Sequence, residues 1–281
     1  MDPNQTKVDY SQLAREARKK ILTMISKAHT SHAASNLSVI DIATVLYENL
    51  NPKDEVVWSK GWAAASVYYF LSKQGKIPYE DLDKFGQEIN GEIPYLGLAE
   101  TTTPGVLVNG GSVGHGLPVA VGMAYAKRLK GEEGIVYCIM SDGELNEGTT
   151  WESAMLANQL NLNNLVVFCD KNSWQAMGRT KDVINMEPLM DKWMSFGWRV
   201  LGVDGHDYEA IETVWNYDWE NNYSTNGISS FEEHDIKNKP LFVICETIKG
   251  KGVSFFEDHL LYHYKHVDED ELQRALAELD A

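Results

Sequence analysis

The chain has 281 residues, of which 43% are apolar and 23% are charged, ordinary values for a globular protein with a sizeable core. Its formal net charge of −16 argues against nucleic acid or an anionic membrane as a partner, because both bind basic surfaces. The N-terminus is polar and acidic, unlike a signal peptide, and no run of about 18 apolar residues occurs, so we expect a cytoplasmic protein.

The first part of the chain predicts helices and one short strand. Apolar residues recur on one stripe within 8–30 and again within 38–49, as in helices that pack on a core. A strand is predicted over 54–61 and a helix over 62–75. Residues 77–109 contain three prolines and are predicted to form loops.

The rest of the chain alternates between strands and helices. Strands are predicted over 134–143, 163–172, 198–205 and 240–252, and helices over 110–131, 147–162, 188–197, 207–217 and 268–281. The strands read as unbroken apolar runs, which is typical of a parallel sheet buried on both faces. We therefore expect a single α/β domain over 1–281, a parallel sheet flanked by helices on both faces. The long polar segment 218–239 is predicted to be a surface insertion.

Two local features complete this outline. Thr149 or Thr150 is expected to cap the helix predicted over 147–162, because Thr is favoured at that position. Each cysteine lies inside an apolar run, so all three are expected to be buried, reduced thiols: Cys138, Cys169 and Cys245.

Polar side chains stand at the ends of two predicted strands. Asp142 ends the strand over 134–143, and Asn172, 30 residues later, ends the next. Because one helix separates them, this is the spacing of a βαβ crossover, and both oxygens can reach one point at the sheet edge. A carboxylate and an amide oxygen suit Mg²⁺ or Ca²⁺. The alternative is that the two side chains only cap turns.

The segment "SDGELNEG" (141–148) favours an anion at the same edge. A helix that starts near Glu147 directs its N-terminus toward this region, and helix N-termini attract phosphate. Gly143 would let a phosphate approach the main chain closely, because it has no side chain.

These residues lie in a segment that resembles a known family. "SDGELNEGTTWESAMLANQLNLNNLVVFCDKNSWQAMG" is similar to the thiamine diphosphate signature and to transketolases in particular. The likeness continues in "SHAASNLSVIDIATVLY", "VVWSKGWAAASVYYFL", "TPGVLVNGGSVGHGLPVAVGMAYA", "DGHDYEAI" and "KPLFVICETIKGKGVSFFE". It covers nearly the whole chain except the first few residues and 218–239.

The resemblance implies the N-terminal, diphosphate-binding subunit of a split transketolase. A full transketolase also carries a pyrimidine-binding domain and a C-terminal domain, so the resemblance implies a pyrimidine-domain partner subunit, with which this chain would form a heterotetramer or larger assembly. The cofactors that it implies are thiamine diphosphate and Mg²⁺. Since the glutamate that activates the aminopyrimidine belongs to the partner, this chain alone is expected to be inactive.

Carried over position by position, the resemblance also implies roles for single residues. The metal ligands would be Asp142, Asn172 and the backbone carbonyl of Trp174. The cofactor-binding residues would be Trp62, Gly114, His115, Gly116, Asp142, Gly143, Glu144, Asn172 and Lys249. His32 would face the reacting carbon, and His263 would contact the diphosphate and the substrate; both would serve in proton transfer and orientation. Glu147 would help to position the partner's catalytic glutamate. In simpler interpretations, His32 is only a loop residue, Lys249 a solvated charge, and Glu144 a solvated charge or one that lies behind the ligands.

Three departures from the family bear on the substrate. Trp62 replaces a histidine that contacts the diphosphate, and its indole offers only one donor. The segment 96–98, Leu-Gly-Leu, lies where the family has a histidine that contacts the donor ketose, and His115 replaces a glutamine. These changes favour a smaller, less polar or unphosphorylated substrate, or a different acceptor.

Three functions therefore stay open. The first is transfer of a two-carbon ketol unit from a ketose donor to an aldehyde acceptor. The second is acyloin formation, or another carbon–carbon bond formation, from a 2-oxo acid. The third is a non-catalytic, regulatory subunit, against which the intact pair of Asp142 and Asn172 argues.

Overall fold

The computed structural model describes residues 8–217 and 233–281, and its centre is one parallel sheet. The strands are β1 (Glu55–Trp58), β2 (Val136–Ser141), β3 (Leu165–Lys171), β6 (Arg199–Asp204) and β7 (Leu241–Glu246). They lie in the order β1-β2-β3-β7-β6, and each adjacent pair is parallel. This confirms the predicted fold class.

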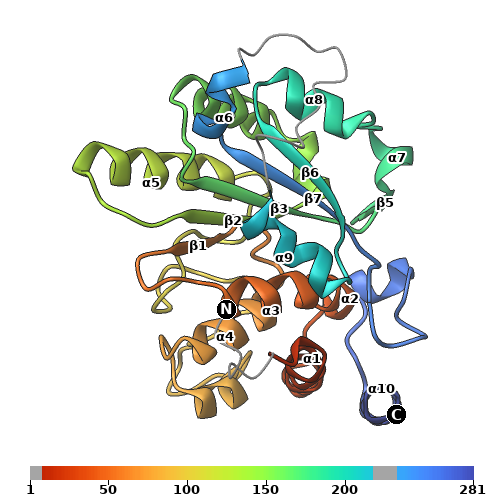
Figure 1. Ribbon diagram of the computed structural model, residues 1–281. Coiled ribbons are helices and arrows are strands. Elements are labelled where there is room, and N and C mark those ends of the chain that lie inside the picture. Colours follow the sequence, from red (N-terminus) through yellow and green to blue (C-terminus); the bar gives the residue numbers. More distant parts are fainter. Residues whose placement is uncertain (1–7, 218–232) are drawn as a thin grey trace.

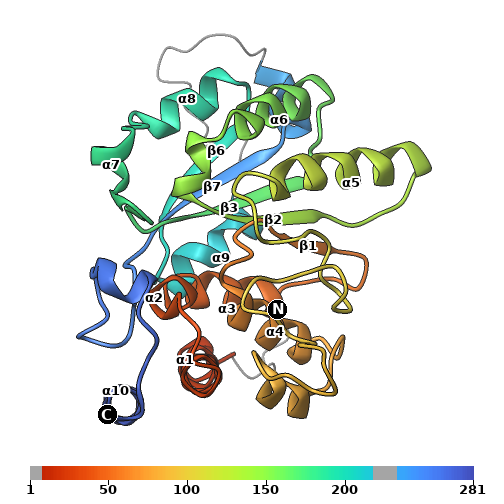
Figure 2. The same ribbon diagram turned by 180° about the vertical axis from the view of Figure 1, so that it is seen from behind.

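Helices cover both faces of the sheet, as two opposite views show (Figure 1, Figure 2). One face carries α5 (Gly116–Lys130), α6 (Gly148–Gln159) and α8 (Leu189–Ser195). The other is covered by α3 (Ile40–Glu48) and α9 (Tyr208–Asn216); α1 (Tyr10–Lys27) and α4 (Ala64–Lys73) pack on α3, and α10 (Glu269–Asp280) packs on α1. Within the described residues, none of the helices is both long and apolar enough to span a bilayer.

Short elements fill the connections. They are α2 (Ala33–Leu37), the hairpin of β4 (Trp174–Gln175) and β5 (Gly178–Arg179), α7 (Thr180–Val183), and 3-10 helices at Tyr79–Lys84, Asp142–Asn146, Glu233–Asn238 and Leu260–His263. The 3-10 helix Asp142–Asn146 follows β2, and the β4–β5 hairpin and α7 follow β3. They therefore surround the carboxyl edge of the sheet, where ligands bind in open parallel sheets.

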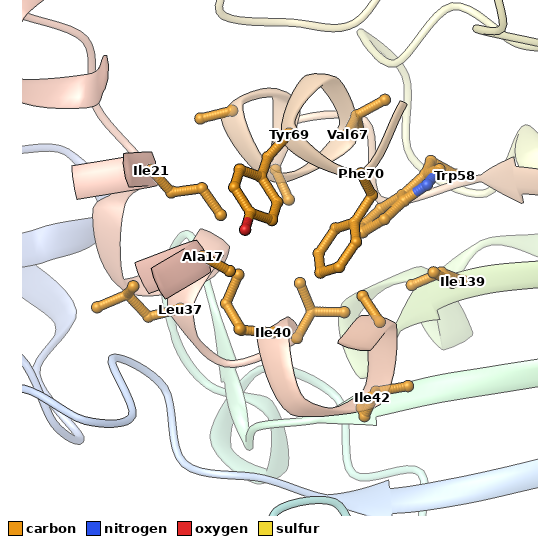
Figure 3. Packing of buried hydrophobic residues seen from close by; sticks show 14 of the residues in the cluster. Ala17, Ile21, Leu37, Ile40, Ile42, Trp58, Val67, Tyr69, Phe70 and Ile139 are labelled. Atoms are coloured by element: carbon orange, nitrogen blue, oxygen red, sulfur yellow. The ribbon is translucent and has the colours of Figure 1, made fainter. Parts of the chain in front are cut away.

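Successive residues of the strands supply two separate cores. In β2, Tyr137 and Ile139 belong to the cluster that includes α1, α3 and α4, whereas Cys138 and Met140 belong to the cluster of α5, α6 and α8. Figure 3 shows the first cluster, in which Trp58 from β1 packs beside Phe70 from α4. This alternation explains why the strands read as unbroken apolar runs. The three cysteines are buried and free, as predicted.

Some local predictions need correction. Thr149 and Thr150 lie inside α6, after its N-cap residue Glu147, so neither caps it; their hydroxyls donate to the carbonyls of Gly114 and Glu144. The hairpin of β4 and β5 was not predicted, since each of its strands has only two residues. Of the predicted insertion, residues 218–232 lie outside the described residues, and Ile236 near its end is buried.

Candidate functional site

A pocket of about 530 Å³ opens at the carboxyl edge of the sheet. Eight of the residues singled out in the sequence line it: His32, Trp62, Gly143, Glu147, Asn172, Trp174, Lys249 and His263. Asp142 lines a neighbouring pocket of about 400 Å³ on the other side of the same loops. Gly114, His115, Gly116 and Glu144 line neither of these pockets. The fold thus collects most of the candidate residues, from both ends of the chain, around one space.

Asp142 and Asn172 lie at the ends of neighbouring strands. β2 pairs with β3 so that Ser141 lies opposite Asp170, which confirms the predicted adjacency. The Oδ2 atom of Asp142 accepts hydrogen bonds from the Ser173 amide at 2.8 Å and the Thr180 hydroxyl at 3.0 Å. Its Oδ1 atom is buried and has no hydrogen-bond partner among the described residues. A buried carboxylate oxygen without a partner is costly, so this atom needs a donor or a cation.

The electrostatics of Asp142 agree with this geometry. Burial, together with the charge of Asp170, raises the pKa of Asp142 to about 7. The Oδ1 atom of Asn172 accepts a hydrogen bond from the Trp174 amide at 3.1 Å, so this side chain does support a turn. Among the described residues, no cluster of three or more His, Cys, Asp or Glu side chains could hold a metal. A cation here would need the carboxylate, the amide oxygen, main-chain carbonyls and ligand oxygens, a set that fits Mg²⁺.

Trp174 is fixed by contacts beyond its own turn. The guanidinium of Arg179 lies 4.0 Å from the ring of Trp174, and the indole Nε1 donates to Asp258 at 2.7 Å. Asp258 also forms an ion pair with Arg179. Because all three groups hold one another, the main chain of the β4–β5 hairpin keeps one position at the pocket.

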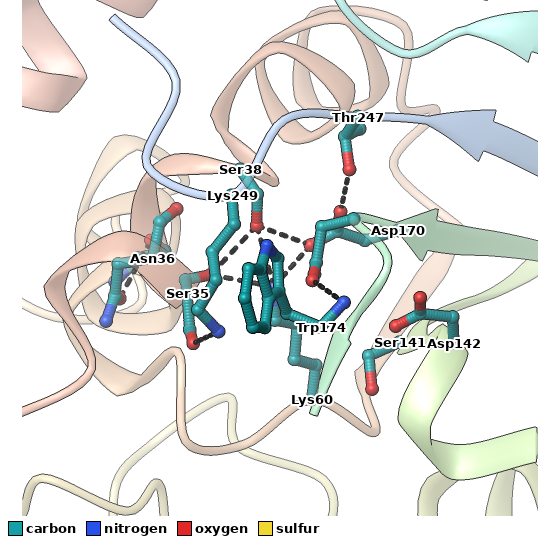
Figure 4. A network of polar contacts seen from close by, with 12 residues as sticks. Ser35, Asn36, Ser38, Lys60, Ser141, Asp142, Asp170, Trp174, Thr247 and Lys249 are labelled. Atoms are coloured by element: carbon teal, nitrogen blue, oxygen red, sulfur yellow. Dashed lines mark hydrogen bonds and ion pairs between the residues drawn. The ribbon is translucent and has the colours of Figure 1, made fainter. Parts of the chain in front are cut away.

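Two charged residues that the sequence did not single out lie next to the pocket. Lys60 and Asp170 form an ion pair in which both side chains are almost completely buried (Figure 4). Lys60 also donates to the Ser35 carbonyl at 2.7 Å and the Ser38 hydroxyl at 3.0 Å. Asp170 accepts from the hydroxyls of Ser38 and Thr247. Burial tends to raise the pKa of Asp170, but Lys60 and these hydroxyls lower it, so Asp170 is a carboxylate.

Lys249 is buried, so the interpretation as a solvated charge is wrong. Its Nζ lies 3.0 Å from Nδ1 of His263 and 3.2 Å from the hydroxyl of Ser35. Burial and the charge of Lys60 lower the pKa of Lys249 to about 8, which leaves it largely protonated at neutral pH. A buried ammonium in a pocket favours an anionic ligand.

The two candidate histidines face each other. The ring centroids of His32 and His263 are 4.8 Å apart in an edge-to-face arrangement, and the His32 amide donates to the His263 carbonyl. Burial and the charge of Lys249 lower the pKa of His32 to about 4 and that of His263 to about 3. Both rings are therefore neutral near pH 7. His32 precedes α2 and lines the pocket beside a second imidazole, so its proposed role stays a prediction.

The three carboxylates after β2 differ in their surroundings. Glu147 is exposed and lines the rim of the pocket. Glu144 is fully buried, so the interpretation as a solvated charge is wrong; it accepts from the amides of Gly114 and Ser141 and from the Ser59 hydroxyl. Glu144 thus binds the loop before α5 to the ends of β1 and β2.

The loop before α5 fits closely against these groups. Gly114 has a φ of 77°, and a Cβ there would lie 2.6 Å from Cβ of Glu147. A Cβ at Gly116 would lie 2.3 Å from Cβ of Ser59. Both glycines are therefore required by packing. His115 between them is exposed.

Comparisons with known proteins show which family the chain resembles. Residues 10–279 match the family described as "Transketolase, thiamine diphosphate binding domain". The chain is 34% identical to a subunit of the apulose-4-phosphate transketolase of Actinobacillus succinogenes, over 98% of this chain and 99% of that protein. It is 32% identical to the 6-deoxy-6-sulfo-D-fructose transketolase subunit SqwG of Clostridium sp. (strain MSTE9), over 99% of this chain and 98% of that protein.

A solved structure shows the same fold. The transketolase of Campylobacter jejuni superposes with a TM-score of 0.82 at 27% sequence identity, over 98% of this chain and 43% of that chain. The chain therefore spans nearly the full length of the Actinobacillus and Clostridium proteins and less than half the length of this solved transketolase.

Proposed function

Since the chain belongs to the transketolase family and carries its thiamine diphosphate-binding domain, we propose that it acts with a pyrimidine-domain partner subunit. The proposed reaction transfers a two-carbon ketol unit from a ketose donor to an aldehyde acceptor. The match to proteins named as subunits, over their full length, supports a partner. The proposed assembly is a heterotetramer.

The observation that carries the proposal is the unpartnered Oδ1 atom of Asp142, at the same sheet edge as the buried ammonium of Lys249. In the proposed complex, Asp142, Asn172 and the carbonyl of Trp174 hold Mg²⁺, and Gly143 lets the diphosphate approach the main chain. Lys249 offsets the negative charge of the diphosphate. When bound, thiamine diphosphate supplies an electron sink that allows the bond next to a carbonyl to break and form.

The chain's own residues would orient the substrate. The ammonium of Lys249 donates to Nδ1 of His263, so the proton of this imidazole is on Nε2. Nε2–H is then a donor for a substrate oxygen, and the neutral ring of His32 stands beside it. Both rings serve in orientation and in holding protons at fixed atoms, rather than as cations.

Calorimetry tests the cofactor site directly. Thiamine diphosphate is titrated into the chain, with and without its partner subunit, in the presence of Mg²⁺ or of a chelator. Binding is expected to require Mg²⁺ and to be lost in Asp142→Ala. Asp191→Ala, which removes an exposed carboxylate from α8, is the matched control and should bind as the wild type does. Equal binding by wild type and Asp142→Ala would contradict the proposed site.

The role of Glu147 depends on the partner. Because Glu147 is exposed at the rim of the pocket, we propose that it meets the partner's catalytic glutamate. Glu147→Gln should lower kcat of the reconstituted enzyme and leave thiamine diphosphate affinity of this chain unchanged. Loss of affinity without the partner would contradict this role.

One observation favours the second candidate function. Part of the pocket lining is apolar and consists of Trp62, Leu98, Val113, Met177 and Ile184. Such a surface suits acyloin formation from a 2-oxo acid, or a substrate less polar than a sugar phosphate. The reconstituted enzyme should be supplied with a ketose phosphate and, separately, with pyruvate, each with an aldehyde acceptor. Turnover with pyruvate but not with the ketose phosphate would support the second function.

A further inference from the structure

A buried polar cluster lies beside the loop that carries Lys249. We call it the Asp41 cluster; its members are Arg18 from α1, Asp41 from α3, and His206 and Tyr208 from the segment between β6 and α9 and the start of α9. None of these residues lines the pocket or was singled out as functional in the sequence. The cluster therefore needs an explanation that the site itself does not give.

Asp41 is saturated with hydrogen bonds. Its Oδ1 accepts from Arg18 Nη1 at 2.9 Å and from the Tyr208 hydroxyl at 2.9 Å. Its Oδ2 accepts from Arg18 Nη2 at 2.6 Å and lies 2.8 Å from His206 Nδ1. Burial would raise the pKa of Asp41, but the bond from His206 and the charge of Arg18 hold it well below its usual range. Asp41 is thus a fixed carboxylate.

The cluster contacts the main chain on both sides of Lys249. The Ile248 amide donates to Nε2 of His206 at 2.8 Å. Nε of Arg18 donates to the Lys251 carbonyl at 3.0 Å. An amide only donates, so Nε2 of His206 carries no proton, and Nδ1 must be the protonated nitrogen that donates to Asp41.

The loop has little freedom between these contacts. The Gly250 amide donates to the Ala34 carbonyl at 2.9 Å, and the Lys249 carbonyl accepts from the Asp258 amide at 2.8 Å. Gly250 has a φ of 83°, and a Cβ there would lie 2.3 Å from the Phe256 carbonyl oxygen. Ile248 is bonded directly to Lys249, so a displacement of the Ile248 main chain also changes where the Lys249 side chain begins.

We propose that His206 is a positioning residue for Lys249. Asp41 keeps the ring proton of His206 on Nδ1, so the unprotonated Nε2 accepts from the Ile248 amide. This hydrogen bond keeps the Lys249 ammonium between Ser35 and His263. The inference rests on the proposed function in one respect, the role of Lys249 in binding the diphosphate. Arg18 acts as the second support through Lys251. Residues behind metal or cofactor ligands commonly affect affinity in this way.

Two variants separate the two nitrogens of the ring. His206→Asn keeps an amide donor near the position of Nδ1 and offers nothing at Nε2. His206→Gln places an amide oxygen near Nε2 and gives up the donor to Asp41. The control is His266→Asn, which removes an exposed imidazole. Thermal unfolding of all three checks that they fold.

Three measurements are made on the full chain. In ¹⁵N NMR of the wild type, His206 should be protonated on Nδ1 alone at neutral pH. In hydrogen exchange without any ligand, the Ile248 amide should exchange faster in His206→Asn than in His206→Gln. In calorimetry with Mg²⁺, His206→Asn should bind thiamine diphosphate about tenfold more weakly, and His206→Gln within about twofold of wild type, as for residues behind a ligand.

The outcomes decide between positioning and mere packing. Equal protection of Ile248 and equal affinity in wild type and His206→Asn would overturn the proposal. Equal losses in both variants would also overturn it, because the acceptor at Nε2 would then make no difference. If the wild type binds no thiamine diphosphate, the proposed function fails, and the exchange of the Ile248 amide, which needs no ligand, still decides whether His206 holds the loop.

Discussion

Gly61 and Gly110 touch main chain to main chain beside the pocket. A Cβ added at Gly110 would lie 2.4 Å from Cα of Gly61, and one added at Gly61 would lie 2.1 Å from Cα of Gly110. The contact joins the turn after β1, which carries Lys60 and Trp62, to the loop that carries Leu98 and Val113. Two walls of the pocket therefore depend on the absence of a single methyl group.

The first prediction follows from this contact. Gly110→Ala should lower the free energy of unfolding by roughly 2–4 kcal/mol, because the atoms that meet the new Cβ are main chain and cannot rotate away. Gly122 is an exposed position of α5, and nothing lies within 4 Å of a Cβ added there. Gly122→Ala should therefore raise the free energy of unfolding by about 0.5–1 kcal/mol. Urea unfolding measures both. If both variants changed the free energy of unfolding in the same direction, the packing argument would be contradicted.

The buried ion pair gives the second prediction. Lys60→Met leaves the carboxylate of Asp170 buried without its cation, and this should cost about 3–5 kcal/mol in the free energy of unfolding. The control is Lys53→Met, which breaks the exposed pair of Lys53 and Glu133 and should cost less than about 1 kcal/mol. Denaturant midpoints compare the two. Similar losses would mean that the hydroxyls around Asp170 suffice to stabilise its charge.

The third prediction has opposite signs for stability and binding. In Asp142→Asn, the amide oxygen can accept from Ser173 and Thr180, and an uncharged NH2 group, which costs less to bury than a charged oxygen, takes the place of Oδ1. The chain without cofactor should therefore unfold at a higher denaturant concentration than the wild type, while Mg²⁺-dependent binding of thiamine diphosphate is lost. A variant that is destabilised by the change would show that Oδ1 already has a stabilising partner.

The fourth prediction concerns pH. In the folded chain the pKa of His32 is about 4 and that of His263 about 3, whereas an unfolded histidine titrates near 6.5, about the model-peptide value. Between these values the unfolded chain binds more protons. The contribution of the two rings to stability is thus present above pH 6.5 and is lost as the pH falls through 4 and 3. The free energy of unfolding of the cofactor-free chain, measured from pH 7 down to pH 4, should fall less steeply in His32→Gln/His263→Gln. Equal slopes would contradict these pKa values.

The sequence predicted the sheet and one edge of the site because both depend on local signals. Apolar runs and crossover spacing are enough to place Asp142 and Asn172 at neighbouring strand ends, and the structure confirms that placement. The buried cysteines follow from the same runs. The alternation of strands and helices also fixes which edge of the sheet receives the loops.

Other parts of the site could not be predicted, because they depend on contacts between distant segments. Lys60 and Asp170 are 110 residues apart, and only the fold shows that they pair. Glu144 reads as a surface charge in a polar motif, yet Ser59 and Gly114 from other loops bury it. Thr150 has the chemistry of a helix cap, but α6 begins before it, at Gly148, and its hydroxyl donates a hydrogen bond to the Glu144 carbonyl.

The place of β7 in the sheet fixes when this pocket can form during synthesis. β7 lies between β3 and β6, both of which are made earlier, so the growing sheet must admit it last. Lys249 and His263 follow β7 along the chain, whereas His32 and Ser35 have left the ribosome long before. A nascent chain that has completed β3 contains about half of the residues that line the pocket. It still lacks Lys249, whose ammonium lies beside His263. The pocket, and with it the proposed cofactor site, is therefore complete only after β7 and the segment that follows it have joined the sheet.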